Sequence, residues 1–165
     1  MATLQKITPN LWFDTQAEAA AEFYTSIFPN SKVDRIARYP EAGEEIHKMT
    51  PGSIMTVDFE LDGQSFIALN AGPVFKFNEA ISFIVHCETQ QEIDDFWEKL
   101  GEGGDPNAQQ CGWLKDKYGV SWQIVPKVLI TLLMDPNPQK AASVFTAMLQ
   151  MKKLEIAALE RAAEG

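Results

Sequence analysis

The sequence predicts an α+β fold in which two tandem βαβββ modules precede a helical tail, and three observations carry this prediction. The motif TQAEAAAEFY at Thr15 recurs as TQQEIDDFW at Thr89, which places two copies of one unit 74 residues apart. Each copy directly follows an extended apolar segment, as expected where a strand leads into a helix. From Met134 onward, the chain changes to residues that favour helix.

The size and charge of the chain limit the classes of function that it can have. At 165 residues and 45% hydrophobic composition, it can bury one well-formed core or two small linked modules. Its formal net charge of -9 and the lack of a basic stripe offer little to a phosphate backbone. We therefore expect no nucleic-acid partner.

The cysteines and the apolar segments bear on location. Cys87 and Cys111 have no CxxC spacing and no nearby pair of histidines, so neither a zinc site nor a disulfide framework is indicated. The opening MATLQKITPN lacks the apolar run of a signal peptide, and the most apolar stretch, residues 128–134, is too short to cross a bilayer. We expect reduced thiols in a cytoplasmic protein that does not associate with membranes.

The first module is predicted from the alternation of apolar residues over ITPNLWFD, residues 7–14. Thr15 and Glu18 have the spacing of a capping box, in which each side chain satisfies a free backbone amide at the start of a helix. That helix should end near Phe28-Pro29-Asn30, since proline disfavours helix in the residue before it. Three strands should follow at residues 32–39, 53–61 and 64–70, with a tight Asp62-Gly63 turn between the last two.

The second module repeats this order of elements. AISFIVHCE, residues 80–88, is a β-rich run, and Thr89 with Glu92 makes a second capping box. The helix should end near Leu100-Gly101, where glycines supply a left-handed stop. After a loop rich in Gly, Asp, Pro and Asn, GWLKDKYG and VSWQIVP should form strands, which leaves this module with a shortened or irregular strand.

The remainder of the chain is predicted to be a helical extension. Asp135-Pro136-Asn137-Pro138 supplies a cap and a proline for a first helical turn. The domain prediction is therefore residues 1–133, with modules at about 5–72 and 78–127, followed by an extension at 134–165. We expect the apolar stripe of the extension to dock on the protein's own core, in preference to serving as a recognition helix. Its members are Ala141, Val144, Phe145, Met148 and Met151, with Ile156 and Leu159 after a break.

Three segments carry a resemblance to a known family. LWFDTQAEAAAEFYTSIFPNS, FIALNAGPVFKFNEAISFIVHCETQQEIDDFWEKL and YGVSWQIVP closely resemble the PhnB-like family of the vicinal oxygen chelate superfamily, which includes glyoxalases, extradiol dioxygenases and bleomycin-binding proteins. Members of this family often carry the label 3-demethylubiquinone 3-methyltransferase. The resemblance covers roughly residues 5–127 and the MKKLEIAAL stretch. It implies a cup formed by paired modules, with a small ligand or a metal at its base, often completed across a homodimer.

In metal-using members of the superfamily, four inward-facing positions supply the ligands, and the last is a glutamate where this chain has Gln123. Carboxylate or imidazole ligands are what a divalent cation needs, and none stands at these positions. We therefore predict no metal and no other cofactor. The residues carried to the other three positions are Thr8 or Asn10, Ala68 or Asn70, and Ala80 or Ser82.

Gln123 brings a side-chain amide into the predicted strand VSWQIVP, and two interpretations of this amide are open. It either bonds a neighbouring strand side chain such as Ser82, or it helps to orient a ligand in a mostly apolar pocket. Strand parity would place further residues on the same wall of the implied cup. The predicted ligand-binding set is Trp12, Phe66, Asn70, Ser82 and Gln123.

These residues leave three classes of function. The first is a metal-free protein that binds a small, partly apolar molecule. The second is an enzyme, either a lyase or isomerase of the superfamily type or the methyltransferase of the label. The sequence identifies no catalytic group, and it lacks the glycine-rich strand-to-helix turn of a Rossmann-type S-adenosylmethionine site. The third is an interaction role through dimerisation. We favour the first, in a homodimer.

Overall fold

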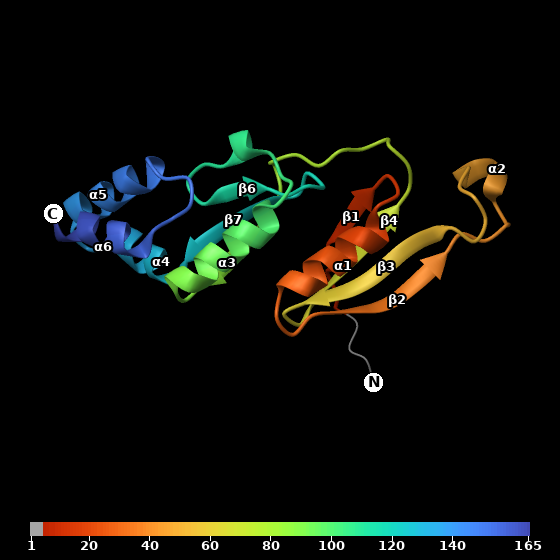
Figure 1. Cartoon of the computed structure of the whole chain (residues 1–165), viewed down its shortest axis with the longest axis horizontal. Helices are drawn as coiled ribbons and strands as arrows, with labels where there is room; N and C mark the ends of the chain where they lie inside the picture. The colour runs from red at the N-terminus through yellow and green to blue at the C-terminus, as the bar shows by residue number, and fades with distance from the viewer. Residues whose placement is uncertain (1–4) are drawn as a thin grey trace. The chain divides into compact units, whose positions relative to one another are not determined.

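The computed structural model describes residues 5–165 as two compact units, which divide between Lys76 and Phe77. Each unit contains one β-sheet with helices, as Figure 1 shows, and each is described by itself. The predicted α+β class with C-terminal helices is confirmed.

The first unit contains a four-stranded sheet in its described part. Its elements are β1 (Asn10–Phe13), α1 (Ala17–Ile27), β2 (Lys32–Arg38), α2 (Glu44–His47), β3 (Ile54–Leu61) and β4 (Gln64–Asn70). The strand order is β1-β4-β3-β2, with β1 parallel to β4 and the other pairs antiparallel. Asp62 and Gly63 have φ values of 46° and 79°, and they make the predicted tight turn between β3 and β4.

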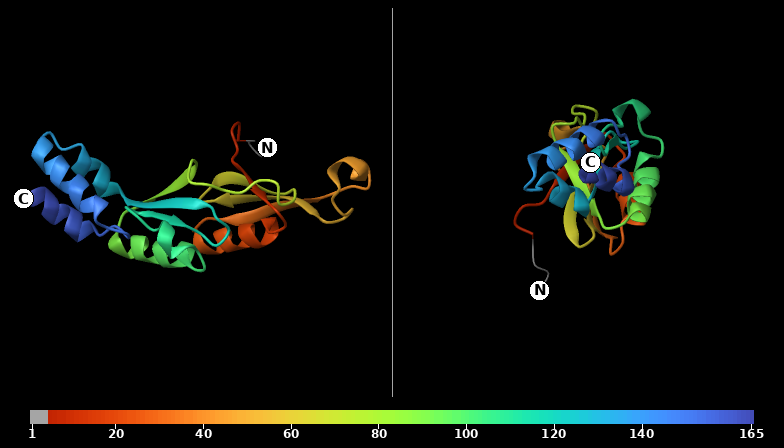
Figure 2. Two further views of the ribbon diagram at one scale, coloured as in Figure 1. Left: turned by 90° about the horizontal axis from the view of Figure 1, so that it is seen from above. Right: turned by 90° about the vertical axis from the view of Figure 1, so that its left-hand side faces the viewer.

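One face of this sheet packs against α1, an arrangement that can be followed in Figure 2. The strands alternate between buried and half-buried side chains, as the two-residue period of a strand requires. Tyr24 of α1 stacks on Phe59 of β3 with 6.3 Å between ring centroids, and Phe59 stacks on Phe66 of β4 at 5.4 Å. The core of the first unit therefore lies between the helix and one face of the sheet.

The start of α1 differs from the prediction. Its N-cap residue is Gln16, which makes no side-chain capping bond, so the predicted capping box at Thr15 does not form. Instead, Asn70 Oδ1 accepts a hydrogen bond from the backbone amide of Ala17 at 2.8 Å, and Asn70 Nδ2 donates to Ile54 O at 3.3 Å. A side chain from a distant strand thus caps this helix, which no local pattern can reveal.

The second unit has a three-stranded sheet in the order β5-β7-β6, with β5 parallel to β7 and β6 antiparallel to it. The bounds are β5 (Ser82–Cys87), α3 (Gln90–Gly101), the 3-10 helix η1 (Pro106–Ala108), β6 (Trp113–Lys115) and β7 (Ser121–Pro126). By sheet order, β5, β7 and β6 correspond to β1, β4 and β3. Within the described residues this unit has no strand equivalent to β2, so the strand predicted to be short or irregular is missing from its sheet.

The helix α3 begins and ends as predicted. Thr89 Oγ1 accepts from the backbone amide of Glu92 at 3.2 Å. The Glu92 carboxylate accepts from the amide of Glu88, one residue before the N-cap, at 2.6 Å. Ile93 and Leu100 are fully buried between α3 and the sheet. The threonine bond of the second capping box is therefore confirmed, and the glutamate accepts from the amide of Glu88 in place of the amide of the N-cap residue Thr89.

Asp116 organises the turn between β6 and β7. Its Oδ1 accepts from the backbone amides of Tyr118 at 2.8 Å and Val120 at 3.1 Å. Its Oδ2 accepts from Trp122 Nε1 at 2.8 Å. The carboxylate is buried, and these three donors hydrogen-bond to it. The turn and the indole of Trp122 are thereby fixed to one another.

Three helices follow β7 directly and pack on one another: α4 (Lys127–Leu133), α5 (Pro138–Leu149) and α6 (Ile156–Glu164). The first of them begins at Lys127, before the residue at which the extension was predicted to start. A buried cluster joins the helices and includes Val144 and Leu159 of the predicted stripe, with Met148 and Met151 packed against it, whereas Phe145 of the stripe is 49% exposed. The cluster consists of Leu129, Val144, Leu154 and Leu159.

No helix within residues 5–165 is long and apolar enough to cross a membrane.

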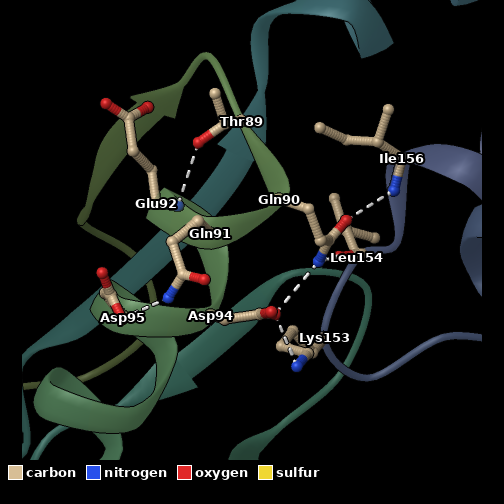
Figure 3. A network of polar contacts seen from close by, with 9 residues as sticks. All are labelled: Thr89, Gln90, Gln91, Glu92, Asp94, Asp95, Lys153, Leu154 and Ile156. Carbon is tan, nitrogen blue, oxygen red and sulfur yellow. Dashed lines mark hydrogen bonds and ion pairs between the residues drawn. The ribbon is translucent and has the colours of Figure 1, made fainter.

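Polar contacts anchor the segment before α6 to α3, as Figure 3 shows. Gln90 Nε2 donates to Asp94 Oδ1 and to Leu154 O, both at 3.1 Å, and Gln90 Oε1 accepts from the amide of Ile156 at 2.8 Å. Lys153 Nζ pairs with Asp94 Oδ1 at 2.6 Å. The C-terminal helices are therefore attached to the second module by hydrogen bonds as well as by apolar packing.

Candidate functional site

The face of the second sheet opposite α3 presents its side chains in cross-strand rows. Residues paired in register on neighbouring strands point to the same face of a sheet. Their sequence neighbours Leu114 and Trp122 are buried on the other face. We refer to the six residues of two adjacent rows as the outer face. One row contains Ser82, Ser121 and Lys115, and the next contains Ile84, Gln123 and Trp113.

Gln123 is bonded to Ser82 on the outer face. Its Nε2 donates to Ser82 Oγ at 2.9 Å, so the interpretation that Gln123 bonds a neighbouring strand is confirmed. This bond does not use the hydroxyl proton of Ser82 or Oε1 of Gln123, which can still donate and accept. Ile84 lies beside Gln123 in register and is 50% exposed. The pair therefore combines polar groups with an apolar neighbour that solvent reaches.

Trp12 lies on the face of the first sheet that points away from α1. Its sequence neighbours Leu11 and Phe13 are buried, whereas Trp12 is half-buried. Trp12 Nε1 donates to Gly72 O at 2.9 Å, and its ring packs edge-on against Phe75 with 4.9 Å between centroids. The indole is thus held in place by the segment that follows β4.

Phe66 and Asn70 lie on the opposite face from Trp12. Both are buried, Phe66 in the ring stack beneath α1 and Asn70 at the start of that helix. The residues of β4 that point away from α1 are Ser65, Ile67 and Leu69. The strand parity assigned to Phe66 and Asn70 is therefore wrong, because a shift of one residue moves every side chain to the other face.

The donors at the superfamily's metal positions do not fit a divalent cation. Gln123 is neutral, and its amide nitrogen is bonded to Ser82. Both side-chain atoms of Asn70 are used in the first unit, and Ala68 offers no donor atom. Among residues 5–165, no three His, Cys, Asp or Glu side chains are grouped so that they could hold a metal ion. The positions therefore lack the anionic and imidazole ligands that such an ion prefers.

Two members of the outer face were not found from the sequence. Ser121 is 2% exposed, and its Oγ has no hydrogen-bond partner among the described residues. Lys115 Nζ forms an ion pair with Glu79, in the segment before β5. Only the register of the strands, which aligns Ser121 and Lys115 with Ser82, identifies them as members of this face. A strand as short as β6, with three residues, gives no pattern from which that register could be predicted.

The buried thiol of Cys87 is not suited to nucleophilic chemistry. The residue is at the end of β5 and is fully buried. Burial raises the pKa of its thiol to about 12, with a smaller contribution from the nearby charge of Glu92. Almost no thiolate is therefore present at neutral pH, and Cys87 contributes packing.

Comparisons with known proteins match most of the chain. The family model described as 3-demethylubiquinone-9 3-methyltransferase matches residues 5–125. The PhnB protein from Bacillus cereus is 39% identical over 74% of this chain and 99% of that chain, with a TM-score of 0.62. Protein PA1353 from Pseudomonas aeruginosa is 19% identical over 75% and 98% of the two chains, with a TM-score of 0.57. Lactoylglutathione lyase from Agrobacterium tumefaciens matches at 14% identity over 78% and 98%, with a TM-score of 0.45. Among curated proteins, none matches.

Proposed function

The chain belongs to the 3-demethylubiquinone-9 3-methyltransferase family, which has the PhnB-like fold of the vicinal oxygen chelate superfamily, and we propose that it binds a small, partly apolar molecule without a metal ion. The observation that carries this proposal is the Gln123–Ser82 hydrogen bond. The bond supports the proposal because it pairs a neutral amide at the position to which the resemblance assigns the glutamate of metal-using members. A few placed polar groups among apolar side chains are the usual lining of a small-molecule site.

The lining residues that we propose are Gln123 and Ser82, both in the second unit. Ile84 and Trp113 flank Gln123 in its cross-strand row and supply apolar surface. Phe66 and Asn70 are left out because they support α1 from within the core of the first unit.

Thermal unfolding in the presence of a metal chelator tests this proposal. The full chain is screened against a panel of chemically diverse small molecules, and at least one should raise the melting temperature saturably. Gln123→Ala should weaken binding of that molecule about fivefold, the effect of one lost hydrogen bond. Gln64→Ala, at an exposed position of β4, is the matched control and should bind normally. A panel without a single saturable shift, or a shift that the chelator abolishes, would contradict the proposal.

The methyltransferase activity in the family description has less support in this chain. A Rossmann-type S-adenosylmethionine site uses a glycine-rich turn from a strand into a helix. The turns that lead into α1, residues 14–16, and into α3, residues 88–89, contain no glycine. Calorimetry with S-adenosylmethionine should therefore show no binding. Tight binding would favour methyltransferase activity over the proposed binding function.

We also propose that the protein is a cytoplasmic homodimer. β2 is an edge strand of seven residues, all exposed or half-buried, and it includes the exposed apolar residues Val33 and Ile36. An edge of this kind is available for pairing with a second copy. Cys87 and Cys111 are free, which suits a reducing compartment. Sedimentation should give the mass of a dimer, and a monomer at every concentration would contradict this state.

A further inference from the structure

We propose that Ser82, Ser121 and Lys115 form an anion subsite on the outer face, which takes the carboxylate of an amphipathic ligand in place of Glu79, the ion-pair partner of Lys115 in the ligand-free protein. This inference rests on the proposed function, because it assigns a ligand class to the same face of the second sheet.

The subsite consists of a row of hydrogen-bond donors. Ser82 Oγ accepts from Gln123, so its own proton is free to be donated to another group. Ser121 adds a second hydroxyl and Lys115 an ammonium group, each from the next strand along the row. Neighbouring strands are about 4.8 Å apart, a spacing at which two oxygens of one carboxylate can reach adjacent donors.

Ser121 provides an observation independent of the row itself. Its hydroxyl is buried and has no hydrogen-bond partner among the described residues. Leaving a buried polar group unpaired is unfavourable, so buried hydroxyls are nearly always bonded. A ligand oxygen placed between Ser121 and Lys115 would supply the missing acceptor.

Glu79 shows how a carboxylate reaches this row. Because β7 lies between β5 and β6, this ion pair joins the segment before β5 to a strand on the other side of β7. A Cβ added at Gly119, in the turn before β7, would lie 3.9 Å from Phe77 Cβ, so this segment passes beside the start of β7. Ser121 is the first residue of that strand. We infer that the segment before β5 covers Ser121.

The ion pair of Glu79 with Lys115 is suited to exchange with a ligand. The Glu79 side chain is 59% exposed, whereas that of Lys115 is 25% exposed. Exposed ion pairs contribute little to stability, so Glu79 can be displaced at small cost. The hydrogen bond from Lys115 lowers the pKa of the Glu79 carboxyl, which is therefore ionised at neutral pH. Glu79 then competes with a ligand carboxylate for the same ammonium group.

The neighbouring row defines the rest of the ligand. Ile84 and Trp113 flank Gln123 and offer apolar surface next to the donors. A small aromatic or aliphatic acid matches this juxtaposition, with its carboxylate on the donor row. The net charge of -9 disfavours anions at long range, but salt screens charges beyond roughly 8 Å, so the contacts within the row decide binding.

Calorimetric titration of the full chain with sodium benzoate tests the subsite. Lys115→Met should weaken benzoate binding about tenfold, because a charge-assisted hydrogen bond is lost. Glu79→Gln should strengthen it several-fold by removing the competitor. Ser121→Ala should weaken it without lowering the melting temperature, since it removes an unpaired buried hydroxyl. Lys99→Met and Glu98→Gln, exposed on α3, repeat the charge changes elsewhere and should have no effect.

Two further titrations identify the chemistry that is recognised. Benzamide has the same ring without the charge, and its binding should not depend on Lys115 or Glu79. Phenyl phosphate presents a larger anion, and tighter binding than benzoate would overturn the assignment of a carboxylate. Failure of benzoate to bind both the natural chain and Glu79→Gln would overturn the subsite. The proposed function would still stand if the chemical panel gave a saturable shift that depends on Gln123, so the two failures are distinguishable.

Discussion

The carboxylate of Asp116 accepts three hydrogen bonds in the turn into β7. Asp116→Asn keeps the shape but replaces one acceptor oxygen with a donor nitrogen, so a buried N–H of Val120 or Trp122 loses its partner. We expect the free energy of unfolding, measured by denaturant titration, to fall by about 2–4 kcal/mol. Asp14→Asn, at an exposed position, should change it by less than about 0.5 kcal/mol. A loss as small as the control's would show that the turn does not need this carboxylate.

Single residues were predicted well where the strand itself contains the information. The two interpretations of Gln123 included the bond to Ser82 because alternation within VSWQIVP separates Gln123 from Trp122 and Ile124. For Phe66 and Asn70 on β4, packing against α1 decides which face of the strand is buried, and this helix is distant in the sequence. Alternation alone is compatible with either face of β4 pointing toward α1, so it does not predict the side to which Phe66 and Asn70 point.

The two capping motifs behave differently at the level of the helix. Thr89 caps α3 through its side chain, whereas Thr15 lies before the N-cap of α1 and that helix is capped by Asn70. Thr89→Ala should therefore lower the free energy of unfolding by about 1 kcal/mol, and Thr15→Ala should leave it nearly unchanged. Chemical denaturation of both variants measures the difference. Equal losses would mean that the two motifs form the same cap.

The attachment of the C-terminal helices to α3 should depend on pH through Asp94. Hydrogen bonds from Lys153 and Gln90 lower the pKa of this carboxyl below its value in the unfolded chain. Its contribution to docking is therefore complete above the unfolded pKa and is lost as pH falls through the folded pKa. The amide resonance of Ile156, which donates to Gln90, should therefore shift in the acid range, below the ordinary pKa of an aspartate carboxyl. The same shift in Asp94→Asn would place the titrating group elsewhere.

The same attachment has a tight backbone approach at Gly112. A Cβ there would lie 3.0 Å from both Ile124 O and Leu154 Cδ1, and the residue has a φ of 84°. Gly112→Ala should lower the melting temperature more than Gly72→Ala, which has a similar φ of 86° and open space around it. The difference between the two variants measures the close approach without the backbone strain that they share. Equal losses would show that Leu154 moves away freely.

The part of the chain before α4 repeats one order of strand, helix and strands, and the repeat is visible in the sequence. The spacing of the two TQxE motifs predicted the tandem order, because a capping box marks the same point in each unit. The lack of a β2 equivalent in the second unit could not be predicted, because the loop that contains η1 shows no alternation of apolar residues from which a strand could be located or excluded. The family match ends at residue 125, and α4 to α6 pack beyond it, joined to the matched part partly through Val125.

Binding without a metal ion is the central claim, and elemental analysis tests it most directly. The purified full chain is equilibrated with zinc, nickel, manganese and iron(II), freed of unbound ions, and assayed for metal per chain alongside its melting temperature. We predict no stoichiometric metal and no stabilisation, because Gln123, Ser82 and the other residues at the superfamily's ligand positions are neutral. One metal ion per chain with a raised melting temperature would contradict the account.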